Sequence, residues 1–144
     1  MTHVIREILY DARVAALLSA CDLPTEDLPS NSQVTFFGVE AEQLRGAVAL
    51  EGSGPSALVR SLAVTPASRG HGLGDALLRH VEVTAASRGV TELYLLTTTA
   101  EHYFIKRGYT SASRESAPAA IAATRQFAGL CPASSAFMVK RFVG

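Results

Sequence analysis

Apolar and polar positions follow one another along the chain in a pattern that predicts strands and helices in turn. Val34 to Val39 and Leu44 to Leu50 are β-rich runs separated by a short polar segment, which predicts an antiparallel hairpin. Beyond a glycine-rich turn, apolar residues recur at every fourth position from Leu73 to Ala85 and predict a helix of about four turns. The strand before this helix and the strand after it complete a βαβ unit.

The same reasoning covers the rest of the chain. Asp11 is a suitable cap for a first helix, and Leu23 to Ser32 reads as a loop with a short helical turn. The remaining predicted strands are Val4 to Leu9, Ala57 to Val64, Glu92 to Leu96 and Ala136 to Phe142, and the remaining predicted helices are Thr99 to Arg107 and Pro118 to Phe127.

Length and composition favour one folded domain over residues 1–144. Hydrophobic residues make up 48% and charged residues 18% of the chain, which is too apolar for a disordered protein. The chain has 13 basic and 13 acidic side chains, so no net charge attracts nucleic acid. Three basic and eight acidic residues precede Arg60, whereas ten basic and five acidic ones follow from Arg60 onward. The second half therefore suits a small polyanionic ligand.

The cysteines and the N-terminal segment bear on the cellular compartment. Cys21 and Cys131 are far apart and match no metal-binding spacing, so we expect neither a disulfide framework nor a metal site. Charges interrupt the N-terminal segment where a signal peptide needs its apolar run, and no segment approaches the roughly 20 apolar residues that span a bilayer. We expect a cytoplasmic protein without a membrane partner.

The strongest chemical signal is the turn Arg69-Gly-His-Gly-Leu-Gly74 between a predicted strand and a predicted helix. Glycines allow backbone conformations that side chains forbid, and amides at a helix N-terminus bind anions. Asp75 stands where the Walker motif and the dinucleotide fingerprint would each need glycine, and the turn has no lysine. Both of these phosphate motifs are therefore excluded, while a tight turn without a ligand stays open.

The pattern Arg69-x-x-Gly72-x-Gly74 resembles the acyl-CoA loop of the GCN5-related N-acetyltransferases (GNAT). The likeness extends from Ala57 to Tyr109, about a third of the chain. It implies an α+β fold, with a central, mostly antiparallel mixed sheet that splays between its fourth and fifth strands and is flanked by helices. The C-terminal part, with Phe127-Ala-Gly-Leu-Cys-Pro-Ala-Ser134, resembles a branch of small-molecule N-acetyltransferases associated with arsenic resistance.

The resemblance implies acetyl-CoA as cosubstrate and assigns its binding residues. Pantetheine would pair with the backbone of Leu62, Ala63 and Val64, and Phe104 would pack against the cofactor. The pyrophosphate would rest on Arg69, Gly70, His71, Gly72, Leu73 and Gly74, with Asp75 opening the helix. Family members are often dimers, so a homodimer stays open.

The catalytic and acceptor residues are less defined. The family tyrosine, four residues before a glycine, is Phe104 here, and the neighbouring Tyr103 is one helical step of about 100° away. Tyr103 or Cys131 could act in catalysis, and Glu40 and Glu51 could serve as bases, although packing or exposed roles are alternatives for each.

A carboxylate on the acceptor would bind an arginine side chain. Arg60 is the preferred candidate for this role, followed by Arg114 and Arg125. Strand alternation places Arg60 on the same face as Leu62 and Val64, either at the acceptor or reaching solvent at a rim.

Three functions follow from the sequence. The first is acetyl transfer to the primary amine of a small, amino-acid-like molecule by direct attack. The second is a catalytically silent acyl-CoA-binding or sensing module, which the phenylalanine at position 104 keeps open. The third is acetylation of a protein.

Overall fold

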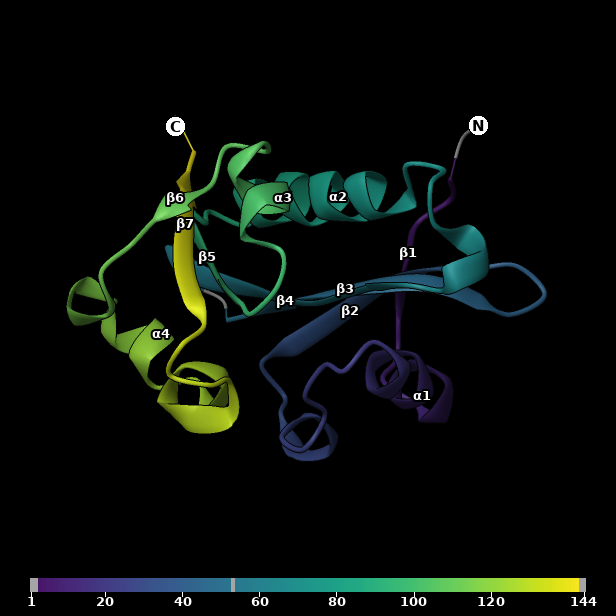
Figure 1. Cartoon of the computed structure of the whole chain (residues 1–144), viewed down its shortest axis with the longest axis horizontal. Helices are drawn as coiled ribbons and strands as arrows, with labels where there is room; N and C mark the ends of the chain where they lie inside the picture. Colours follow the sequence, from purple (N-terminus) through teal and green to yellow (C-terminus); the bar gives the residue numbers. More distant parts are fainter. Residues whose placement is uncertain (1–2, 53, 143–144) are drawn as a thin grey trace. The chain divides into compact units, whose positions relative to one another are not determined.

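The computed structural model describes residues 3–52 and 54–142, which contain a seven-stranded sheet in the order β1-β2-β3-β4-β5-β7-β6 (Figure 1). The strands are β1 (Arg6–Ile8), β2 (Val34–Glu40), β3 (Leu44–Glu51), β4 (Ser56–Val64), β5 (Glu92–Thr97), β6 (Thr110–Ser111) and β7 (Ala136–Arg141). The helices are α1 (Ala12–Ala20), α2 (Leu73–Ser87), α3 (Glu101–Ile105) and α4 (Ala119–Ala122), with short helical turns η1 (Leu28–Ser30), η2 (Pro66–Ser68), η3 (Arg114–Ser116) and η4 (Gln126–Leu130).

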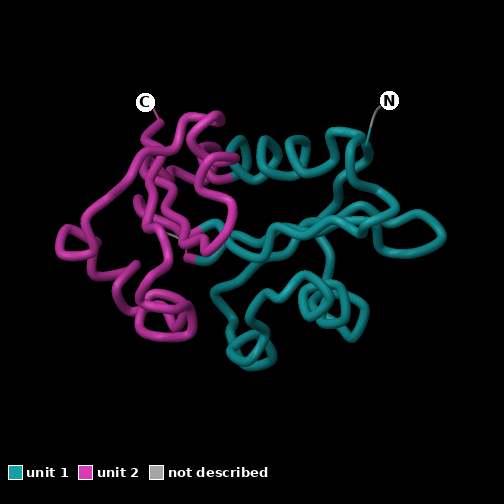
Figure 2. Tube along the Cα trace, in the orientation of Figure 1, with its two compact units in different colours: residues 1–51, 59–84 teal, residues 52–58, 85–144 magenta. Residues whose placement is uncertain are grey.

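The chain forms two compact units (Figure 2). Unit 1 comprises residues 1–51 and 59–84, and unit 2 comprises residues 52–58 and 85–144. Strand β4 contributes its first residues to unit 2 and the rest to unit 1. A single domain over the whole chain stays a prediction.

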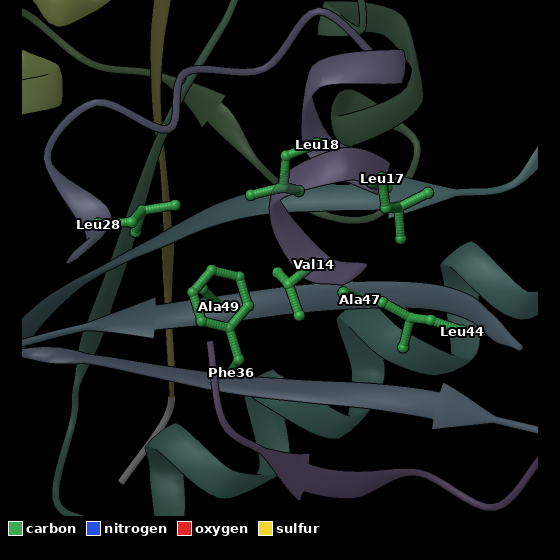
Figure 3. Packing of buried hydrophobic residues seen from close by; sticks show 9 residues of the cluster. Val14, Leu17, Leu18, Leu28, Phe36, Leu44, Ala47 and Ala49 are labelled. Carbon is green, nitrogen blue, oxygen red and sulfur yellow. The ribbon is translucent and has the colours of Figure 1, made fainter. Parts of the chain in front are cut away.

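In unit 1, α1 and α2 lie on opposite faces of the β2–β3 hairpin (Figure 1). Asp11 caps α1 as expected, because its carboxylate accepts hydrogen bonds from the amides of Arg13 and Val14. On the α1 face, apolar side chains of the helix pack on the small residues of β3 (Figure 3). This cluster contains Val14, Leu17, Leu18, Leu28, Phe36, Leu44, Ala47, Ala49 and Ala63.

On the other face of this hairpin, α2 packs closely against β3. A Cβ on Gly46 would lie 3.0 Å from a methyl carbon of Leu77 and 3.1 Å from one of Leu73, so a side chain there would require these leucines to shift by a few tenths of an ångström. The ring of His80 lies 5.0 Å from the ring of Phe37 on β2. This packing holds the N-terminal turn of α2, and therefore the glycine turn before it, against the sheet.

In the sheet order, β5 lies between β4 and β7. The beginning of β4 pairs in parallel with β5, from Ser56↔Glu92 to Leu58↔Tyr94, whereas β7 pairs antiparallel with both β5 and β6. The buried core of unit 2 consists of Leu58, Tyr94, Ile121, Phe137 and Val139.

The predicted α+β class with a mostly antiparallel mixed sheet is confirmed. The pairing of β4 with β5 covers three residues on each strand. The helix predicted from Pro118 to Phe127 is divided into α4 and η4. Gly129, inside η4, has a φ of 151°, which is not a helical value. The two-residue strand β6 was not predicted, because two exposed residues carry no hydrophobic pattern.

Candidate functional site

The glycine turn in unit 1 has the geometry of an anion-binding loop. Gly70 and Gly72 have φ values of 83° and 76°, which L-residues with side chains rarely adopt. A Cβ at either position would meet nothing within 4 Å, so the backbone conformation and not crowding requires glycine there. The turn is exposed from Arg69 to Gly72, which leaves its main chain accessible to a ligand.

Helix α2 begins directly after this turn, at Leu73. Its first helical hydrogen bond runs from the amide of Ala76 to the carbonyl of Gly72, over 3.0 Å. The amides of a first helical turn have no partner within their helix, and 15 aligned peptide dipoles add partial positive charge there. Asp75 lies in this first turn, where the dipole favours its carboxylate. The amides of the first turn and the helix dipole both suit an anionic ligand at the turn.

The side chain of Arg69 folds back onto the end of β4. Its Nε donates to the carbonyl oxygen of Val64 over 3.2 Å, and Nη2 lies 3.8 Å from the sulfur of Cys21. The carbonyl of Val64 is therefore already engaged by protein. A contact of Arg69 with a phosphate stays a prediction. His71 is exposed, and its carbonyl oxygen lies 3.2 Å from the imidazole of His3.

Strand β4 contains a backbone irregularity that corrects the predicted alternation. Ser61 has a φ of 61°, in the left-handed region. After it, Ala63 packs in the cluster with α1, and Arg60 contacts Asp27 beside the same cluster. The prediction that Arg60 shares a face with Leu62 and Val64 is wrong, because Ser61, in its left-handed conformation, shifts the alternation of side chains along the strand by one position. Leu62 and Val64 are half-buried.

Arg60 itself is completely buried, so the alternative in which it reaches solvent at a rim is also wrong. Its guanidinium forms a two-pronged pair with Asp27, over 2.7 and 2.9 Å, and contacts Glu51 over 2.9 Å. Its relative side-chain exposure is 0%. The role of Arg60 in acceptor binding stays a prediction, but its guanidinium already binds two carboxylates.

The charges of this cluster support one another. Burial disfavours the charged form of Asp27, but hydrogen bonds and electrostatic attraction from Arg60 outweigh burial, so the pKa of Asp27 is lowered. Burial likewise opposes the charge on Arg60, and the two carboxylates outweigh it, so the Arg60 pKa is raised. Of the two carboxylates considered as bases, Glu51 is paired with Arg60 in this cluster, and Glu40 is paired with Arg13 at the surface.

In unit 2, α3 carries the aromatic residues considered for catalysis. Phe104 is 8% exposed and packs edge-on against the rings of Tyr103 and Tyr109. Tyr103 is half-buried, and the guanidinium carbon of Arg107 lies 3.6 Å from the centre of its ring. Packing of Phe104 against the cofactor stays a prediction, and the structure shows two tyrosines as its partners. The Tyr103 hydroxyl remains the proton donor proposed for this helix.

A second group in unit 2 surrounds the start of β7. Nη2 of Arg114 donates to the carbonyl of Ser135 over 3.0 Å, and its guanidinium carbon lies 5.5 Å from the ring centre of Phe127. Ser135 is buried, and its hydroxyl has no hydrogen-bond partner among the described residues. A buried hydroxyl without a partner is costly unless a ligand or water satisfies it. Cys131 is a half-buried thiol before this strand.

Arg125, the third predicted acceptor ligand, is exposed, whereas Arg114 donates to the carbonyl of the buried Ser135. Sequence reasoning missed Ser135, because one serine in a polar loop carries no signal. It also missed Ser61 and Asp27. Two adjacent polar residues, Arg60 and Ser61, inside an otherwise apolar strand were the available indication of the irregular backbone.

Within the described residues, no helix is both long and apolar enough to cross a membrane. Nor does any group of three or more His, Cys, Asp or Glu side chains in residues 3–52 and 54–142 have an arrangement that could hold a metal ion.

Comparison with known proteins identifies the family. Residues 32–111, more than half of the chain, match the acetyltransferase (GNAT) domain. The chain belongs to the GNAT family. Over 57 residues, 40% of its length, it is 44% identical to the amino-acid acetyltransferase of Ralstonia nicotianae, but this match spans only 13% of that longer protein.

Solved structures show the same GNAT fold. N-acetylglutamate synthase from Neisseria gonorrhoeae, complexed with coenzyme A and N-acetyl-glutamate, superposes on all of this chain with a TM-score of 0.81 at 24% identity. This chain covers 36% of the synthase. Rv2747 from Mycobacterium tuberculosis, in complex with CoA and NLQ, has a TM-score of 0.75 at 19% identity, with 97% of this chain and 99% of that one covered.

Proposed function

We propose that this GNAT domain transfers the acetyl group of acetyl-CoA to the primary amine of a small, amino-acid-like molecule. The observation that carries the proposal is the glycine turn, in which Gly70 and Gly72 adopt positive φ, stay exposed and lead directly into a 15-residue helix. Family membership, relatives named amino-acid acetyltransferase and neighbours that bind coenzyme A support it.

The proposed cofactor residues lie in unit 1. The amides of Arg69 to Gly74 hold the pyrophosphate, and Leu62, Ala63 and Val64 offer main-chain groups to pantetheine. Because Arg69 already donates to the carbonyl of Val64, we assign the pantetheine pairing first to Leu62 and Ala63. When a phosphate binds, the guanidinium of Arg69 can still present its other nitrogen atoms to it.

The chemistry requires a neutral amine. Its nitrogen attacks the thioester carbonyl carbon and gives its surplus proton to a base or a chain of water molecules. A C–N bond forms as the C–S bond breaks, and the thiolate of CoA receives a proton. We assign this proton to the hydroxyl of Tyr103. Phe104, at the usual tyrosine position, has no proton to give. Cys131 is the alternative, through an acetyl-cysteine that would need a base beside it.

Acceptor recognition is assigned to Arg114 and Ser135 in unit 2. Nη2 of Arg114 donates one of its two hydrogens to the protein, so its second N–H and that of a neighbouring guanidinium nitrogen can form a fork with a carboxylate. The hydroxyl of Ser135, which has no partner among the described residues, adds a second hydrogen-bonding group beside it. A carboxylate-bearing amine, such as an amino acid, combines both required features. The C-terminal run before β7 extends the proposed acceptors to arsenic-containing amino-acid analogues.

A silent acyl-CoA-binding module is the second candidate, and it is favoured by the buried packing of Phe104 between two tyrosines. Purified protein is incubated with acetyl-CoA and a panel of amino acids, arsenic-containing analogues and peptides, and free thiol is measured. Thiol release that depends on one amino acid supports the proposal. Binding of CoA in a thermal-shift assay without turnover on any amine would favour the silent module. Release with peptides alone would favour protein acetylation.

A further inference from the structure

Arg60 and Ser61 are adjacent on β4, and each is unusual for a strand. Arg60 is a cation with a completely buried side chain, and Ser61 has a φ of 61°. A residue other than glycine keeps such a conformation only when its surroundings determine it. The two features therefore call for one explanation.

The guanidinium of Arg60 joins three segments of unit 1. Nη1 and Nη2 bind both carboxylate oxygens of Asp27, which flanks η1, and Nη1 also contacts Glu51 at the end of β3. The remaining nitrogen, Nε, donates to the hydroxyl of Ser61 over 3.3 Å. The amide nitrogen of Asn31 donates to both carboxylates over 3.3 Å. All three guanidinium nitrogens thus have a defined partner.

The direction of the following main chain depends on Ser61. In a strand, successive residues point to opposite faces, and one residue in the left-handed region shifts this alternation. Ala63 consequently faces α1, and the peptide groups from Leu62 to Val64 are directed differently from those of a regular strand. These are the groups assigned to pantetheine above.

We propose that Arg60 is a positioning residue that holds Ser61 in the left-handed conformation and thereby directs the main chain of Leu62 to Val64 toward acetyl-CoA. This inference rests on the proposed function. Lysine cannot replace arginine here, because a single ammonium group cannot bind both carboxylate oxygens of Asp27, the carboxylate of Glu51 and the hydroxyl of Ser61 at once. Glycine at position 61 would remove the need for the clamp, since glycine adopts positive φ without strain.

The test is a double-mutant cycle on the full chain, with the dissociation constant for CoA measured by calorimetry at 10 °C. We expect R60K to weaken binding about tenfold, within the range of couplings between contacting residues. In the S61G background, the same change should alter affinity less than about twofold. R13K is the matched control, because Arg13 also bridges two carboxylates, Asp11 and Glu40, at the surface of the same unit.

The outcomes separate this inference from the proposed function. If the wild-type protein does not bind CoA, the proposed function fails and the inference with it. If the wild type binds and R60K binds equally well, or weakens binding by the same factor in both backgrounds, only the inference is overturned. A purely structural role would lower the melting temperature of R60K without changing affinity at 10 °C. If R60K does not unfold cooperatively, D27N replaces it in the cycle, with the same expected result.

Discussion

Substitution of Gly72 by alanine tests the anion-binding turn most directly. Gly72 precedes α2 with a φ of 76°, and a Cβ there would meet nothing within 4 Å. The substitution therefore adds no internal collision, and its cost is the backbone strain of an L-residue in the left-handed region, about 1–2 kcal/mol. If the loop relaxes to negative φ, the strain is relieved but the peptide before Leu73 rotates.

The matched control lies just beyond the other end of α2. Gly89 has a φ of 88°, and a Cβ there would also meet nothing within 4 Å. Both variants should therefore lose about 1–2 kcal/mol of unfolding free energy, measured by denaturant titration. Their affinities for CoA should differ, because only the turn at Gly72 is assigned to the pyrophosphate.

The size of this difference follows from the hydrogen bonds involved. Hydrogen bonds to charged groups contribute about 1.5–3 kcal/mol, so losing one amide contact in G72A should weaken CoA binding roughly 10- to 100-fold by calorimetry. G89A should bind within about twofold of the wild type. Equal affinities in the two variants, or a G72A protein that binds CoA as tightly as the wild type, would refute the placement of the pyrophosphate.

Three further predictions address the proton, the acceptor and the buried charges. Y103F should lower kcat about 100-fold with an unchanged dissociation constant for CoA, and an unchanged kcat would exclude this tyrosine as the acid. R114K should raise KM for the amino acid about tenfold without changing KM for acetyl-CoA, and S135A should act in the same direction; equal effects on both substrates would contradict the acceptor assignment. The pKa of Asp27 is lowered in the folded state, so its contribution to stability is complete above its ordinary value of 3.8 and is lost as pH falls through the folded pKa. The unfolding free energy of the wild type should therefore fall more steeply below pH 4 than that of D27N in denaturant titrations, and parallel curves would argue against this linkage.

The regular elements could be predicted because their signals are local. The cap at Asp11, the four-residue spacing from Leu73 and the β-rich runs of the hairpin each occur within one segment, and each predicted element is present. The glycine turn could be predicted for the same reason, since the required backbone conformation and the helix that follows are encoded within a few residues.

The residues that sequence reasoning misplaced depend on partners distant in the chain. Arg60 was expected at a ligand or at a rim, but Asp27 lies 33 residues before it, in a loop without a periodic pattern. Strand alternation failed at Ser61 because the surrounding contacts, and not the residue's own preference, hold it at positive φ. The Ser135 hydroxyl, which has no partner within residues 3–52 and 54–142, likewise could not be found from the sequence, because its burial depends on the folded chain.

The buried cluster of Arg60, Asp27 and Glu51 also restricts how this sequence can change during evolution. Removal of one partner of a buried pair typically destabilises a protein by about 3–5 kcal/mol, whereas exchange of all the partners for well-packed apolar residues is often neutral. Each single step toward an apolar cluster thus passes through a destabilised protein. The three positions are therefore expected to mutate jointly, so that descendants of this chain keep all three charges or have lost them together.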